Sequence, residues 1–243
     1  MKKVLAFTLA EGASHGDIWG GSCKAAFTLA EVLITLGIIG VVAAMTLPAL
    51  TANYQKRVVE TKLSKFYSTI SQAINLEVAD EGEVIYWLPN CSSNDNNCII
   101  SWWNEHIQKH IKTLKTISTS GDKELNLIRF ADGTAMQPFL NGTELHMIYC
   151  VDEKHCELKA IDNGAWYQLP MDGKYAFLFT IETNNERLKG RFVTDYNIYQ
   201  EMTTEQLIEE CKKTNNGTIN AGGCTTLIQR NGWKIPKNYP IKF

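Results

Sequence analysis

The sequence lacks any long block of lysine or arginine residues, and its charges nearly balance. It has 24 basic and 26 acidic residues, which give a formal net charge of −2. The electrostatic footprint of a duplex-binding protein is therefore absent. The sequence also has no phosphate-binding G-x-x-x-x-G-K motif, no H-E-x-x-H zinc motif and no EF-hand loop. We therefore expect no general nucleic-acid binding, no cofactor and no metal site.

One apolar run is long enough to span a bilayer, and it contains a single carboxylate. Residues 26–50 read AFTLAEVLITLGIIGVVAAMTLPAL, with Glu31 near the start. Placing an unpaired charge at bilayer depth costs about 3 kcal/mol or more, so such an acid indicates a function and a partner. A cut between Ala26 and Phe27 would create an amino terminus one helical turn from Glu31. We therefore predict that this new amine is its partner.

These residues resemble the amino-terminal signal of type IV pilins and of the pseudopilins of type II secretion systems. In that family a peptidase cuts before a Phe, the new amine is N-methylated, and the fifth mature residue is Glu. The resemblance implies that residues 1–26 are a leader that is removed, and that residues 27–50 form a transmembrane and assembly helix. It assigns processing to Ala26 and Phe27, and assembly to Glu31, Gly37, Gly40 and Pro48.

Two features of the leader differ from the usual family pattern. The residue before the expected cut is Ala26, where Gly is usual. The hexapeptide AFTLAE also occurs twice, at residues 6–11 and 26–31, but only the second copy opens an apolar run. Polar and glycine-rich residues follow the first copy, which we interpret as a duplicated leader segment.

Six of the seven cysteines follow the apolar run, as expected for a domain in an oxidising compartment. The seventh, Cys23, would leave with the leader, so the mature chain would keep an even number. Six cysteines allow fifteen pairings, and proximity in sequence favours three short loops. The expected disulfides are Cys91 to Cys98, Cys150 to Cys156 and Cys211 to Cys224.

The remaining sequence predicts an α+β fold with an antiparallel sheet. Apolar residues at three- and four-residue spacing indicate an amphipathic extension of the helix over residues 51–80. Residues 81–243 form the expected extracytoplasmic globular domain. Its predicted elements are a helix over 101–114, a hairpin of 125–130 with 136–140, strands over 145–151 and 175–181, a helix over 204–213, and an irregular tail over 224–243.

Histidines are the remaining candidates for chemistry. His106 and His110 lie four residues apart on an expected helix, a spacing that can hold Zn²⁺. The acid of this segment precedes the first histidine, so the general-base arrangement of a metalloprotease is missing. We therefore expect two exposed histidines. A second candidate metal cluster consists of His146, Cys150, His155 and Cys156. We expect a disulfide between Cys150 and Cys156 there instead.

The expected function is that of a structural subunit, not an enzyme, in a pilus or a secretion pseudopilus. The resemblance implies as partners other subunits, a prepilin peptidase and methylase, an inner-membrane assembly platform and membrane lipid. The chain would be a single-pass protein of the cytoplasmic membrane before it enters a surface or periplasmic filament. Type II secretion, surface pili and DNA uptake share this signal, so the sequence does not choose among these machines.

Two alternatives belong to other classes. Residues 42–44 (VAA) precede Met45 and resemble an ordinary signal-peptidase site, which would release a secreted binding protein. The second alternative is a membrane-anchored enzyme. It would require a pocket that brings His106, His110 or His146 together with a carboxylate.

Overall fold

The structure is a computed structural model that describes residues 28–92, 95–111, 114–120, 123–142, 144–155, 159–161, 166–168, 170–183, 187–213 and 222–243. The chain divides into two compact units, Met1–Leu47 and Pro48–Phe243. Helix α1 (Leu29–Glu81) contributes to both units, and the boundary between them falls at Pro48 inside this helix.

The described part of the first unit is the apolar half of α1. Its large aliphatic side chains are exposed all round the helix, including Leu33, Ile38 and Val42. By length and composition α1 could cross a membrane, a criterion that an amino-terminal signal sequence also meets. A continuous exposed apolar surface of this kind is typical of a helix that contacts lipid or another protein.

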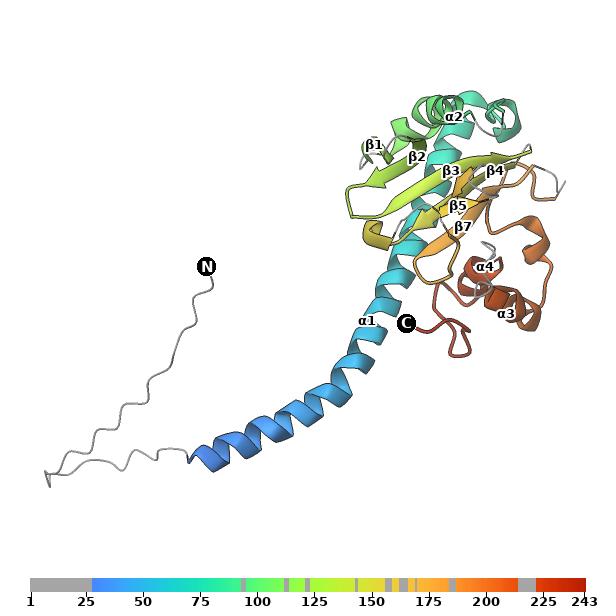
Figure 1. Ribbon diagram of the computed structural model, residues 1–243. Helices are drawn as coiled ribbons and strands as arrows, with labels where there is room; N and C mark the ends of the chain where they lie inside the picture. The colour runs from blue at the N-terminus through green and yellow to red at the C-terminus, as the bar shows by residue number, and fades with distance from the viewer. Residues whose placement is uncertain are drawn as a thin grey trace, which may run out of the picture. The chain divides into compact units, whose positions relative to one another are not determined.

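The second unit is built on a six-stranded antiparallel sheet in the order β1-β2-β3-β4-β7-β8 (Figure 1). The strands are β1 (Leu114–Ser120), β2 (Lys123–Phe130), β3 (Ala135–Asn141), β4 (Glu144–Cys150), β7 (Ala176–Ile181) and β8 (Phe192–Thr194). Strands β5 (Lys159–Ile161) and β6 (Trp166–Gln168) form a separate two-stranded ribbon.

Helical segments flank the sheet. The longer ones are α2 (Asn96–Trp102), the π-helical segment η2 (Trp103–Ile107), α3 (Thr204–Lys212) and α4 (Cys224–Arg230). Short 3-10 segments are η1 (Val84–Tyr86), η3 (Gln108–His110), η4 (Glu153–His155) and η6 (Asn197–Gln200).

The second half of α1 covers one face of the sheet. Its buried stripe includes Leu63, Phe66 and Ile70, which belong to the same apolar cluster as Tyr149 and Phe179. The ring of Phe66 stacks on that of Tyr149 with centroids 4.0 Å apart. Because side chains alternate across a strand, β4 and β7 present their intervening residues to the opposite face.

The opposite face is covered by α3, α4 and, from the carboxy-terminal tail, Tyr239 and Ile241, whereas Trp233 and Ile235 pack on the α1 side. Ile148 and Leu178 cluster there with Cys211 and Cys224. The sheet therefore lies between α1 and the α3–α4 pair, and Figure 1 shows these helices on its two sides. Both faces of β4 and β7 are buried, which explains their nearly continuous apolar sequences.

Polar contacts fix α1 to the rest of the second unit. Lys62 Nζ donates to the Val151 carbonyl oxygen at 2.7 Å, and Lys65 Nζ forms an ion pair with Asp132 Oδ2 at 2.8 Å. Glu60 accepts a hydrogen bond from the Ile235 backbone N–H at 2.9 Å. These contacts join the helix to segments far away in the sequence.

The predicted α+β fold, with a long amino-terminal helix followed by an antiparallel sheet, is confirmed. The hairpin turns at Gly133, whose positive φ of 76° suits glycine. Helix α3 starts with a capping box between Thr203 and Gln206, close to the predicted boundary. The prediction of an irregular tail was wrong in part, because its first seven residues form α4.

Two of the three expected disulfides are present, Cys91–Cys98 and Cys211–Cys224. Cys150 is also disulfide-bonded. Its expected partner, Cys156, lies outside the described residues, so that pairing stays a prediction.

Candidate functional site

The first candidate site is the start of helix α1. Thr28 and Glu31 stand three residues apart, which is the spacing of a capping box. Glu31 Oε2 accepts hydrogen bonds from the Thr28 backbone N–H and from Thr28 Oγ1, both at 2.8 Å. In return, Thr28 Oγ1 accepts from the Glu31 backbone N–H at 3.2 Å. The carboxylate thus satisfies one backbone amide at the start of the helix, and the Thr28 hydroxyl satisfies another.

The other predicted processing and assembly residues are placed as follows. Ala26 and Phe27 lie outside the described residues, so the expected pairing of Glu31 with the Phe27 amine stays a prediction. A Cβ added at Gly37 or Gly40 would meet no atom of the described chain within 4 Å. Both glycines therefore leave room for a neighbouring molecule to approach the helix backbone.

The second candidate site lies at the other end of α1, around the buried carboxylate of Glu77. Glu77 is fully buried, although it carries a charge. Its Oε1 lies 2.6 Å from His106 Nδ1, and its Oε2 lies 2.8 Å from both His110 Nε2 and Lys109 Nζ. His106 belongs to η2, whereas Lys109 and His110 belong to η3. Three nitrogen donors from one helical segment therefore converge on one acid of α1.

The expectation that His106 and His110 are exposed was wrong. Their side chains are only 15 % and 12 % exposed. The predicted helix over 101–114 instead spans residues 96–110 and passes through a π-helical and a 3-10 segment. This irregular helix turns both rings toward α1. The His106 ring also stacks on Trp87, with centroids 5.2 Å apart.

Glu77 was not identified from the sequence, although a signal was available. It continues the buried stripe of α1 through Ile70 and Ile74 at helical spacing. An acid on the apolar face of an amphipathic helix needs a buried partner. The sequence did not reveal that two histidines 29 and 33 residues away would supply it.

The contacts of Glu77 keep it ionised. Burial alone would raise the pKa of this carboxyl. The hydrogen bonds from Lys109, His110 and His106 outweigh burial and hold the pKa of Glu77 at about 2. The same contact raises the pKa of Lys109. The cluster is therefore a charged centre under neutral conditions.

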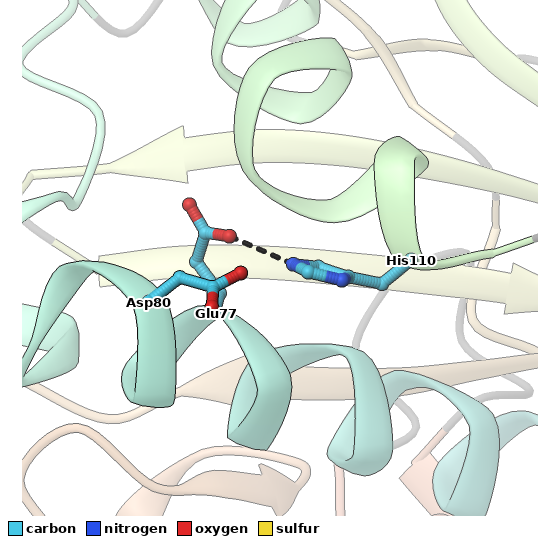
Figure 2. Close-up of side chains that lie close together, drawn as sticks. All are labelled: Glu77, Asp80 and His110. Atoms are coloured by element: carbon cyan, nitrogen blue, oxygen red, sulfur yellow. Dashed lines mark hydrogen bonds and ion pairs between the residues drawn. The ribbon is translucent and has the colours of Figure 1, made fainter.

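Asp80 adds a second carboxylate beside Glu77, one turn further along α1. Figure 2 shows both acids projecting from α1 toward the His110 ring. One ligand atom from each of Glu77, Asp80 and His110 lies within 4.8 Å of the others. Chemically, this arrangement can hold protons or a divalent cation.

The other two histidines in the described part of the chain, His146 and His155, are not part of this cluster. His146 is fully buried, and its Nδ1 lies 2.8 Å from Thr180 Oγ1 on the neighbouring strand β7. Burial lowers the pKa of His146 to about 4, so this ring is neutral. The ring of His155 stacks on Tyr175 with centroids 3.8 Å apart. Because Cys150 is disulfide-bonded, it cannot join His146 and His155 in a thiolate metal site.

Comparison with known proteins gives two matches on adjacent parts of the chain. The prokaryotic N-terminal methylation motif matches residues 21–47. This match confirms the resemblance to prepilin-type proteins and, with the apolar half of α1, indicates membrane anchoring. No curated protein and no solved structure matches the chain.

The second match covers nearly all of the unit that begins at Pro48. The family described as "Family of unknown function (DUF6613)" matches residues 49–243, which is most of the chain. This protein therefore belongs to the DUF6613 family, and it carries a prepilin-type methylation motif ahead of the family's domain.

Proposed function

We propose that this chain is a structural subunit of a type IV pilus or a type II secretion pseudopilus. The observation that carries the proposal is the methylation motif at residues 21–47, which lies over an exposed apolar helix. Prepilin peptidase would cut between Ala26 and Phe27, and the Phe27 amine would then be N-methylated. The subunit would wait in the cytoplasmic membrane, held by residues 27–50, with residues 81–243 outside the cytoplasm.

Assembly follows from the surface of the apolar helix. On extraction from lipid, the exposed aliphatic side chains would pack against the helices of other subunits, where buried apolar area contributes about 25 cal/mol per Å². Gly37 and Gly40 would allow close approach of these helices. An inner-membrane platform would carry out the extraction. The disulfides of the second unit support an oxidising compartment outside the cytoplasm.

Glu31 would change partner during this step. In the described chain its carboxylate caps the first turn of α1 through Thr28. In the filament it would pair with the Phe27 amine of a neighbour. Leaving one member of a buried pair unsatisfied costs about 3–5 kcal/mol, so this pair would penalise subunits in the wrong axial register.

Three variants separate the charge of Glu31 from its capping role. Glu31→Gln keeps a residue that suits a capping box but removes the charge. Thr28→Ala removes the threonine half of the cap and keeps the charge, whereas Glu31→Ala removes the charge together with the carboxylate half of the cap. The measurements are leader removal in membrane fractions and subunit content in sheared surface fractions or pseudopilus preparations.

We expect all three variants to be processed. Both Glu31 variants should lose at least about tenfold in filament content, which corresponds to 1.4 kcal/mol, while Thr28→Ala should stay near the wild-type level. Normal incorporation of Glu31→Gln would contradict the pairing. Absence of the wild-type chain from every filament fraction would contradict the proposed function.

A further inference from the structure

We propose that Glu77, Asp80 and His110 form a Zn²⁺ site that joins the end of helix α1 to η3. Glu77 and Asp80 project from successive turns of α1, and His110 faces them from the following helical segment (Figure 2). Their ligand atoms lie within 4.8 Å of one another. A fourth, open position would be taken by water.

The ligand atoms lie near enough for zinc to bind after small side-chain movements, because all three are within 4.8 Å of one another. Tetrahedral sites place nitrogen and oxygen ligands about 2.0–2.2 Å from the ion, which separates the ligands by about 3.3–3.6 Å. His110 Nε2 and Glu77 Oε2 now lie 2.8 Å apart, joined by a hydrogen bond. Zinc would replace the shared proton, and the pair would move apart by about 0.5–0.8 Å.

The donor set selects zinc over the common alkaline-earth cations. Ca²⁺ and Mg²⁺ prefer sites made entirely of oxygen ligands, whereas imidazole together with carboxylate suits Zn²⁺. His106 would complete the site without binding the ion. Its Nδ1 lies 2.6 Å from the other oxygen of Glu77, a contact that orients the carboxylate.

Lys109 is the competitor for this position. Its Nζ lies 2.8 Å from the same Glu77 oxygen that we assign to zinc, and its side chain is 40 % exposed. The lysine can therefore swing into solvent when the ion enters. In the purely structural alternative, Lys109 and the histidines satisfy Glu77 permanently and no metal binds.

Substitution of Lys109 distinguishes zinc binding from the purely structural alternative. If zinc binds, Lys109→Gln removes a competing cation and should tighten binding. Asp80 is exposed, so Asp80→Asn removes a ligand without disturbing the core. His155→Gln is the control for the loss of a histidine, because His155 lies in η4 and its ring stacks on Tyr175, which is not part of this site.

The experiment measures zinc binding to the full chain in detergent after EDTA treatment and dialysis. Equilibrium dialysis against ZnCl₂, with metal content determined by mass spectrometry, should give one ion per chain. Asp80→Asn and His110→Gln should weaken binding at least about tenfold, Lys109→Gln should strengthen it, and His155→Gln should not change it. Excess MgCl₂ should not displace the ion.

Thermal unfolding provides an independent readout, because an ion that binds only the folded chain raises the melting temperature. Zinc should raise it for the wild type and for His155→Gln, and should raise it less for Asp80→Asn at the same zinc concentration. Failure of the wild type to retain zinc would overturn the proposal. So would equal zinc binding by the wild type, Asp80→Asn and His110→Gln. Neither result bears on filament assembly.

Discussion

At position 195, an aspartate is fully buried and adopts a positive φ of 56°. Its Oδ2 accepts a hydrogen bond from the Thr226 backbone N–H, in the first turn of α4, at 2.7 Å. Burial raises the pKa of Asp195 to about 7, although the donors around it act in the opposite direction. This carboxyl therefore takes up a proton far more readily in the folded chain than in the unfolded one.

The sign of the resulting pH dependence follows from linkage. Because the folded pKa is the higher one, the free energy of unfolding should fall as the pH rises from about 4 to about 7, and then level off. The change from 3.8 to about 7 corresponds to at most about 4 kcal/mol. Asp195→Asn should remove this slope. Denaturant unfolding at pH 4, 5.5 and 7 measures it.

Asp132 supplies the control for this prediction. Burial would raise its pKa, but hydrogen bonds from Lys65 and Thr134 prevail and lower it. Asp132 therefore contributes to the free energy of unfolding above the pKa of the unfolded chain, and this contribution is lost on acidification. Asp132→Asn should accordingly lower stability at neutral pH more than at acidic pH. An unchanged slope in Asp195→Asn would show that Asp195 does not cause the loss of stability with rising pH.

At the scale of elements, the second half of α1 is an amphipathic helix with one buried stripe. Leu63 is fully buried against the sheet, whereas Leu76 on the same helix is 52 % exposed. The two leucines therefore allow the same substitution in two environments.

Leu63→Ala should lower the free energy of unfolding by about 3–5 kcal/mol, because it leaves a cavity in the core. Leu76→Ala should change it by less than about 0.5 kcal/mol. Chemical denaturation of both variants, followed by circular dichroism, makes the comparison. Similar losses for the two leucines would contradict the proposed packing of α1 on the sheet.

The elements that could be predicted from the sequence are those with strong local signals. Helix α1 has a sustained apolar period, α3 has a capping box, and the β2–β3 hairpin has an Asp-Gly turn at Gly133. Helix α4 lacked such a signal, because CTTLIQR contains β-branched residues and follows a glycine. One amide donor of its first turn, that of Thr226, is met by Asp195, which is remote in sequence.

The candidate sites show the same division. Glu31 could be identified because a carboxylate within a single apolar run is unusual and is visible in the local sequence. The cluster around Glu77 could not be predicted, because it depends on the packing of η2 and η3 against α1 and on a π-helical turn that rotates His106. Local patterns do not determine which buried acid a distant histidine will meet.

At the scale of the whole molecule, two independent divisions of the chain coincide. The compact units meet between Leu47 and Pro48, and the two family matches cover residues 21–47 and 49–243. A prepilin-type signal thus precedes a separate folded domain. In the proposed function, the first part would provide anchoring and assembly.

Mass spectrometry of the mature amino terminus is the most direct test of this account. The chain should be purified from both the membrane and the secreted fraction of a cell that contains a prepilin peptidase. We predict that it begins at N-methylated Phe27, and that deletion of the peptidase gene leaves the leader attached. A mature chain that begins at Met45 would indicate an ordinary secreted protein, and an intact Met1 in the presence of the peptidase would show that the signal is not used. Either result would contradict the account.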